Sequence, residues 1–280
     1  MSTTIVHNIL SMNSQRAIYR TQMKMDQAVQ RLSTGLRINH AWDDPAGLAV
    51  SERFRAQISS MQEAERNANY NMNLLATAEG ALSSIDDILI RMRALSIEAS
   101  NGTLIDEDRQ TLDLEFQQLK SEITRIANSA NYAGVGLLDG SYSATNPNGF
   151  KFHIGEYNTA NNDYYYVQLN PINANTLGLI PNNLLDTASA QASIDKLDLA
   201  IQSKDLVRAH VGSYVNRLQQ TVLALQTGQE NATRSESQIR DADIAKEMSE
   251  FVRAQILMQS GVAMLSQANM LPQIVAGLIG

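Results

Sequence analysis

The sequence predicts a mainly α-helical protein, built from long antiparallel coiled-coil helices with a small β-hairpin region in the middle. Its 280 residues include only 15 glycines and five prolines, so the residues that most often interrupt helices are scarce. No proline falls within 46–146 or 182–271, which leaves two long stretches that can be helical. Apolar residues recur along both stretches at spacings typical of helices that pack along their length.

The first helix is predicted over about 4–32. Gly35 follows a Ser-Thr pair and can take the left-handed conformation that ends a helix. The apolar stripe of this helix runs at spacings of seven, four, three and four through Ile18, Met25, Val29, Leu32 and Leu36.

The second helix is predicted from Pro45 towards Ser100. Asp44 is a typical N-cap before a proline at the first helical position, and Asn101-Gly102 stops the helix. A helix of this length with an unbroken seven-residue apolar repeat indicates coiled-coil packing. The repeat consists of Phe54, Met61, Ala68, Leu75, Leu82 and Leu89.

Four charged residues interrupt the seam of the second helix. They lie either at the rim of the packed seam or in contacts between subunits, and the sequence leaves both readings open. They are Glu65, Glu79, Asp86 and Arg93.

The middle of the chain is predicted to be irregular, after a third helix that starts near Asp106 and ends around 131–134. Its first residues are acidic, which suits the positive end of the helix dipole. Alternating apolar residues at 150–154 and 165–169, with a turn at 161–163, predict a β-hairpin.

Helical patterning resumes near Thr187, weakens over 235–243, where a kink or short linker is expected, and continues in a final helix from Ile244. The final helix carries two adjacent apolar stripes. Its apolar face is therefore wider than one neighbouring helix covers, which favours partners on more than one side.

The two ends of the chain are unusual in charge. The first charged residue is Arg16 and the last is Arg253, although the whole chain has a net charge of −7. An uncharged tail must pack against the body, against the other tail or against other copies of the chain. The start lacks the pattern of a secretory signal peptide, so we expect no Sec export, and polar residues interrupt the C-terminal segment too often for a membrane anchor.

Several function classes are disfavoured by the sequence. The chain has no cysteine and an acidic balance, which argue against thiol chemistry and against broad nucleic-acid binding. The four histidines lack metal-ligand spacing, and no catalytic motif is present. We therefore expect no enzyme activity, no metal and no cofactor. The carboxylate pairs Asp43-Asp44 and Asp241-Asp243 are interpreted as groups for helix capping and salt bridging rather than as paired catalytic carboxylates.

Motifs near both ends resemble those of one family, the bacterial flagellins. The N-terminal signature is similar over residues 13–16, 32–39, 43–49 and 69–80, and the C-terminal signature over 235–243 and 267–269. The similarity covers roughly 1–140 and 186–280. The short middle resembles a minimal flagellin that has inner domains and one hairpin but no large outer domains.

The resemblance implies a structural subunit that polymerises into the extracellular flagellar filament and serves motility. It implies a terminal coiled-coil core domain made of 1–42 with 241–280, and a helical-bundle domain over 43–240 with the hairpin at about 141–186. It further implies unfolded export through the flagellar type III apparatus. The implied partners are other copies of the chain, an export chaperone, the filament cap and hook-associated junction proteins, with no nucleic acid and no membrane.

Two groups of residues receive roles. A vertebrate innate-immune flagellin receptor is implied to contact Arg91, Leu95 and Glu115, although Ala94 stands where many relatives have Glu; the alternative is that Leu95 packs and Arg91 faces solvent or a filament neighbour. The polymerisation interface is predicted to include Ile5, Ile9, Met12, Leu257, Val262, Met264, Leu265 and Leu271.

Two other functions compete with the filament subunit. A hook–filament junction protein shares the same end motifs but does not form long filaments. A membrane-active type III secretion protein would use the same apolar segments to perturb lipid.

Overall fold

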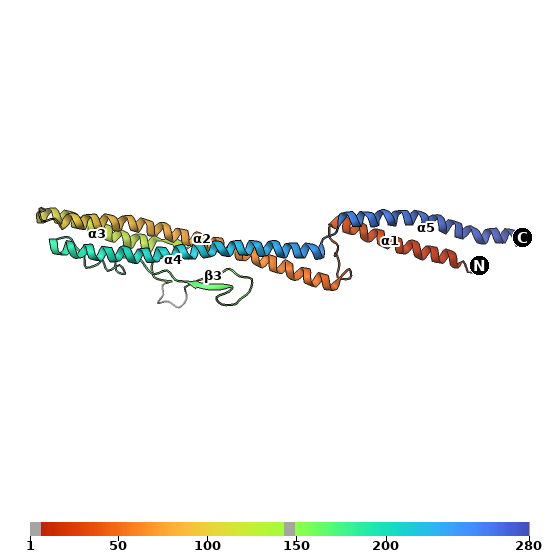
Figure 1. The fold of residues 1–280 in the computed structure, drawn as a ribbon, viewed down its shortest axis with the longest axis horizontal. Helices are drawn as coiled ribbons and strands as arrows, with labels where there is room; N and C mark the ends of the chain where they lie inside the picture. Colours follow the sequence, from red (N-terminus) through yellow and green to blue (C-terminus); the bar gives the residue numbers. More distant parts are fainter. Residues whose placement is uncertain (1–6, 143–148, 280) are drawn as a thin grey trace. The chain divides into compact units, whose positions relative to one another are not determined.

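Helices dominate the computed structural model, which describes residues 7–142 and 149–279, with side chains up to residue 270 (Figure 1). The mainly α-helical prediction is confirmed. The helices are α1 (Ile9–Thr34), α2 (Pro45–Ala99), α3 (Asp106–Ser129), α4 (Thr187–Arg240) and α5 (Ile244–Ile279). The strands are β1 (Asn131–Tyr132), β2 (Val135–Gly136), β3 (Phe150–His153) and β4 (Tyr164–Val167).

The chain divides into two packed units, and we describe each by itself. Unit 1 comprises residues 1–58 with 230–280, and unit 2 comprises residues 59–229. This division follows packing alone. The predicted division at 42 and 241 follows the role of each part in assembly, and it stays a prediction.

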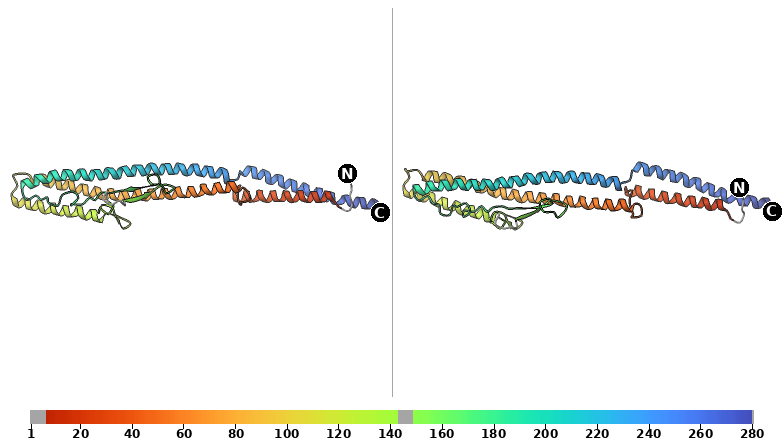
Figure 2. Two further views of the ribbon diagram at one scale, coloured as in Figure 1. Left: turned by 90° about the horizontal axis from the view of Figure 1, so that it is seen from below. Right: turned by 60° about the horizontal axis from the view of Figure 1, so that its bottom comes forward.

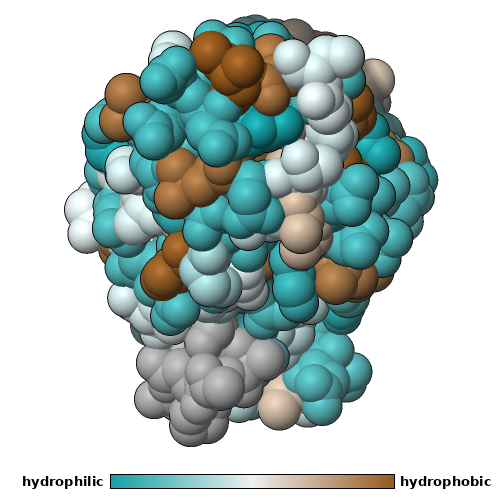
Figure 3. Space-filling view, turned by 90° about the vertical axis from the view of Figure 1, so that its left-hand side faces the viewer, coloured by the Kyte–Doolittle hydropathy of each residue, from teal (hydrophilic) through white to brown (hydrophobic). Residues whose placement is uncertain are grey.

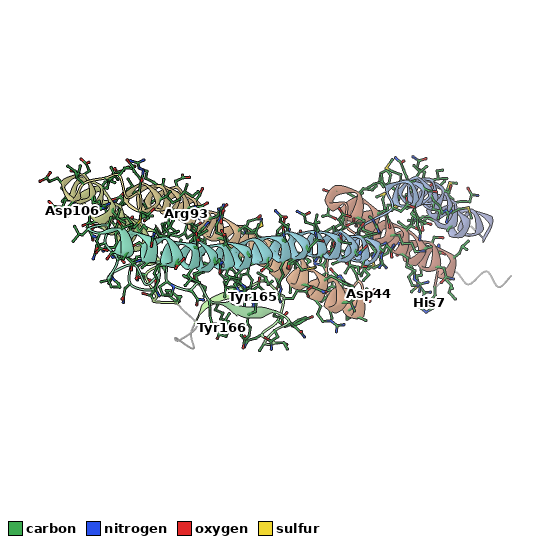
Figure 4. The ribbon with its side chains drawn as sticks, turned by 60° about the vertical axis from the view of Figure 1, so that its left-hand side comes forward. His7, Asp44, Arg93, Asp106, Tyr165 and Tyr166 are labelled. Carbon is green, nitrogen blue, oxygen red and sulfur yellow. The ribbon has the colours of Figure 1, made fainter. Side chains whose placement is uncertain are left out.

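The helix ends in unit 1 follow the local signals in the sequence. Gly35 has a φ of 70° and its N–H donates to the carbonyl of Arg31, which closes α1. Asp44, labelled in Figure 4, accepts the N–H of Gly47 through its side chain at 2.9 Å and so caps α2. α1 begins at Ile9, later than the predicted start, because the side chain of Asn8 caps it by accepting the N–H of Ser11.

The core of unit 2 is formed by the heptad face of α2 together with α3 and α4, which the ribbon views show running alongside one another (Figure 2). Leu75, Leu82 and Leu89 have no exposed surface. Burying a side chain of this size contributes about 1.5–3 kcal/mol. The core is completed from α3 and α4 by Phe116, Ile123, Leu197 and Leu218.

The charged residues on the α2 seam pair with α4 inside the same chain. Nε of Arg93 lies 2.7 Å from the Asp198 carboxylate, and Nζ of the buried Lys204 lies 2.5 Å from that of Asp86. Further along, Glu79 accepts from Arg208 at 2.9 Å and Glu65 from Gln226 at 2.7 Å. Residue numbers rise on α2 as they fall on α4, so the helices are antiparallel. Of the two alternatives, the rim of the packed seam therefore describes the contacts that these charged residues make within the single chain.

The predicted hairpin is present as β3 and β4, paired antiparallel with Phe150 opposite Val167. Phe152, Tyr165 and Val167 face the core, whereas Tyr166 is exposed; Tyr165 and Tyr166 are labelled in Figure 4. Asn161 in the connecting segment has a φ of 68°, which an Asn tolerates better than most residues.

A second, smaller hairpin formed by β1 and β2 was not predicted. Its two central residues, Ala133 and Gly134, both have positive φ values, 51° and 84°. That is the pattern of the type I′ turn, which Asn-Gly signals much better than Ala-Gly. The sequence suggested only a helix end here because Ala at such a φ is uncommon.

The end of unit 2 that carries the α2–α3 turn has a mixed surface. Hydrophobic residues lie there in small separate groups among hydrophilic ones (Figure 3). Scattered apolar residues of this kind are normal on a soluble surface. The terminal helices are different, as described next.

Candidate functional site

The candidate functional site is the antiparallel pair formed by α1 and α5 in unit 1. Two long-range polar contacts fix the register of the pair. The guanidinium of Arg31 donates to the carboxylate of the buried Glu247 at 3.0 Å, and the Asn8 side chain donates to the carbonyl of Ala268 at 2.9 Å. No sequence signal identified these pairs, since the partners are more than 200 residues apart.

The connections at the base of the pair are also tied together. The N–H of Arg37 donates to the carbonyl of Arg240 at 2.7 Å, and that of Ala242 donates to Gly35 at 2.9 Å. Leu36 and Asp241 thereby form an isolated antiparallel bridge. The break between α4 and α5 is confined to 241–243, at the end of the 235–243 stretch where a kink or short linker is predicted, and 235–240 continues α4.

The predicted capping role is confirmed for Asp44 and Asp243, whereas Asp241 accepts a hydrogen bond from the Ser237 hydroxyl. Besides the Asp44 cap, Asp43 accepts the backbone N–H groups of Asn39 and His40 at 3.0 and 2.9 Å. The hydrogen bond from the His40 backbone is the main cause that lowers the pKa of Asp43. Asp243 caps α5 by accepting the N–H of Lys246 at 3.1 Å.

The α1–α5 pair buries small side chains and exposes large ones. The fully packed positions hold Ser11 and Ala28 on α1, and Ala254 and Ala268 on α5, besides Glu247. Gly261 approaches Ile18 so closely that an added Cβ would lie 2.9 Å from its Cγ1. Large exposed apolar side chains cover the outside: Ile9, Leu10, Met12, Tyr19, Met23 and Val29 on α1, and Ile244, Met248, Val252, Ile256, Leu257, Val262, Met264 and Met270 on α5.

Most of the predicted interface residues lie on this outer surface. Ile9, Met12, Leu257, Val262 and Met264 are exposed, and Leu265 is half-buried. Ile5 and the side chain of Leu271 lie outside the described residues. Tyr19 and Met23 were not among the predicted interface residues, although spacings of seven residues from Met12 to Tyr19 and four from Tyr19 to Met23 place them on one face of a helix with Met12.

The residues carried over for receptor contact fall into two classes. Arg91 on α2 and Glu115 on α3 form an exposed two-point ion pair at 2.7 and 2.9 Å. This pairing lowers the pKa of Glu115 and raises that of Arg91. Leu95 has no exposed surface and packs in the core of unit 2. Any direct contact would therefore be made through Arg91 and Glu115, and the receptor role stays a prediction.

Neither a metal centre nor a membrane span is found in the part of the chain that the structure describes. Within 7–142 and 149–279, no group of three His, Asp or Glu side chains could hold a metal ion. None of the helices in those ranges has the length and apolar content needed to cross a bilayer.

Comparison with known proteins places the chain in a family. The model for the bacterial flagellin N-terminal helical region matches residues 5–143, and that for the C-terminal helical region matches residues 194–279. The crystal structure of Bacillus cereus flagellin is similar with a TM-score of 0.50 and 35% identity, covering 57% of this chain and 88% of that one.

Full-length relatives point to the same family. Flagellin FlaB1 of Treponema pallidum and a flagellin of Halalkalibacterium halodurans are each 39% identical to this chain, over 98% of its length and 99% of theirs. A flagellar filament 33 kDa core protein of Treponema phagedenis is 38% identical over the same shares. Two family models that together span most of the chain, and relatives matched along nearly their whole length, show that the chain belongs to the bacterial flagellin family.

Proposed function

We propose that this flagellin is built into the flagellar filament through its paired terminal helices, which pack in the filament core. Its membership of the flagellin family already identifies it as a filament subunit. The observation that carries the finer proposal is the packing of α1 and α5, in which the fully buried apolar residues are alanines and many large apolar residues are exposed. A concentration of large exposed apolar residues is typical of an interaction site.

A repeated copy of the chain suits this surface because both helices expose apolar groups along their length. From Ala254 onward the chain carries no charged residue, so a neighbouring copy can pack on this part of α5 without burying a charge of α5. Each copy both offers and receives such a surface, as helical assemblies with head-to-tail contacts require. The interface residues proposed are those predicted from the sequence, Ile5 and Leu271 included.

The finer setting of this function is also proposed. The subunit is exported through the flagellar type III apparatus with an export chaperone, and assembles outside the cell beneath the filament cap, next to hook-associated junction proteins. Arg91 and Glu115 are the exposed residues through which the vertebrate innate-immune flagellin receptor would engage it. No catalytic role is proposed, since the family is structural.

Deleting residues 254–280 tests the assembly proposal. The truncated chain is expected to remain soluble, to keep the helical circular dichroism of unit 2, and to form no filaments by negative-stain electron microscopy. The control is the full chain under the same conditions, seeded with filament fragments. Filaments from the truncated chain would overturn the proposal. A full chain that never forms long filaments would favour the junction-protein alternative, and liposome leakage without filaments would favour the membrane-active one.

Hydrogen exchange gives a second test. In the unassembled chain the outer faces of α1 and α5 are open to water, so their amides are expected to exchange faster than those of the heptad core of α2. Assembly is expected to protect 9–34 and 244–270 selectively. Equal protection before and after assembly would contradict packing of these helices in the filament core.

A further inference from the structure

Trp42 is the only tryptophan of the chain, and 77% of its surface is exposed. It lies in the linker between α1 and α2, within unit 1. Tryptophan is usually highly buried, and it is enriched among the few residues that dominate the energetics of protein interfaces. A single ring left this open has no packing role within the described chain that matches its size.

The ring is held in place rather than free to move. It stacks on the imidazole of His40, with the ring centroids 4.3 Å apart and an interplanar angle of 19°. Nε2 of His40 lies 2.7 Å from the side-chain nitrogen of Gln30 on α1. The linker backbone is fixed by the two N–H bonds to Asp43 described above. A preorganised aromatic group loses little conformational entropy when a partner covers it.

The Trp42 stack continues an exposed stripe on α1. Met12, Tyr19, Met23 and Gln30 follow one another at spacings of seven, four and seven. At 3.6 residues per turn these positions lie within about 40° of one another around the helix. The side chains of Met12, Tyr19 and Met23 are exposed, and Gln30 is the residue that holds His40.

This stripe is distinct from the face of α1 that packs on α5. The half-buried residues Ile18, Met25 and Leu32 lie about 120–160° away around the helix. Heptad-type spacing on two separate faces means that α1 has one seam for α5 and a second one with no partner in the described part of unit 1. We call Met12, Tyr19, Met23 and Trp42 the Trp42 stripe.

We propose that the Trp42 stripe is a contact surface for a second copy of this chain, with Trp42 as its aromatic anchor. The proposal rests on the proposed function. The second copy is the occupant that the molecule itself offers, because every copy carries the part of α5 from Ala254 onward, which has no charged residue and exposes apolar side chains. An apolar partner surface without charges matches a stripe whose members are methionine, tyrosine and tryptophan. The stripe is also continuous with Met12 of the terminal interface.

The fluorescence of Trp42 tests the contact without labelling, since no other tryptophan contributes. Excited where tyrosine does not absorb, the unassembled wild-type chain is expected to emit as an exposed indole and to be quenched strongly by iodide. In filaments the emission is expected to shift to shorter wavelength and most of the iodide quenching to be lost. Filaments seen by electron microscopy with unchanged emission and quenching would overturn this inference while leaving the proposed function intact.

Two variants measure how much the Trp42 contact contributes to filament growth. Trp42→Ala is expected to raise the critical concentration for seeded filament growth by about tenfold or more, as removal of an interface anchor does. The control is Tyr157→Ala, which removes an aromatic residue of similar exposure (68%) from unit 2 and is expected to change the critical concentration by less than about twofold. Equal effects of the two variants would overturn the inference. A blue shift on zwitterionic vesicles, with none in filaments, would instead assign the stripe to lipid.

Discussion

Truncating one exposed leucine of α5 tests whether the outer face of the terminal helices drives assembly. Leu257 is 54% exposed in the single chain. We expect it to become buried between copies in the filament. Replacing it with alanine keeps a strong helix former at this position, so the change acts on the apolar surface rather than on the helix.

The expected magnitude follows from the exposed fraction. Leu257→Ala removes three carbons, worth about 0.8 kcal/mol each when buried, or about 2.4 kcal/mol in all. Roughly half of this remains to be gained on assembly, because 54% of the residue is still exposed. The loss is therefore about 1.3 kcal/mol per subunit, which raises the critical concentration about ninefold.

The assay is seeded elongation followed by sedimentation, with the unpolymerised concentration measured at equilibrium. Leu199→Ala on α4 is the matched control, since Leu199 is 56% exposed but lies outside the terminal helices. We expect the control to change the critical concentration by less than about twofold. A Leu257→Ala value within twofold of wild type, or an equal rise in the control, would refute the reasoning.

Three further predictions concern the single chain. Leu89→Ala leaves a cavity at a site with no exposed surface and is expected to lower the free energy of unfolding, measured in urea, by about 2–5 kcal/mol. The control is Ile90→Ala at the neighbouring exposed position, which is expected to change this free energy by less than about 0.5 kcal/mol. Similar losses in the two variants would contradict the described core. Glu247→Gln removes the charged partner of Arg31 and is expected to speed hydrogen exchange over 9–34. Unchanged exchange would contradict a role for this ion pair in holding α1 on α5. The lowered pKa of Asp43 means that its hydrogen bonds to the linker backbone stabilise the fold fully above the ordinary value of 3.8 and are lost as the pH falls through the folded-state pKa. The melting-temperature difference between wild type and Asp43→Asn should therefore shrink below about pH 4, and a constant difference would argue against a stabilising role for these hydrogen bonds.

The helices could be predicted from the sequence because their signals are local. The start of α2 is fixed by Asp44 and Pro45, its end by Asn101-Gly102, and its buried face by a repeat of seven. Each of these acts over one or two turns of chain. The hairpin of β3 and β4 was equally readable from the alternation of apolar and polar residues.

The long-range pairs could not be predicted, because they depend on which turns of distant helices lie opposite each other. The buried Arg109 illustrates this: its guanidinium donates to the carbonyls of Ala99 and Asn101 and so completes the end of α2. In the sequence it is one more charged residue in an acidic helix start. Lys204 is similar. Burial lowers its pKa, but hydrogen bonds with Asp205 and Asp86 outweigh this and leave the pKa raised.

The two units place their large apolar residues in opposite ways, and this contrast links the fold to assembly. Unit 2 encloses leucines such as Leu82 between α2, α3 and α4, so its stability is provided within one chain. In unit 1 the close approach of α1 and α5 depends on residues such as Ala28 and Ala254, which bury little surface. Where the helices meet, larger residues such as Ile18, Met25 and Leu32 are only half-buried, and many other large apolar side chains lie exposed on the outer faces. Under the proposed assembly, neighbouring copies supply the apolar burial that the described part of the terminal pair lacks by itself, so completion of its packing and growth of the filament would be the same event.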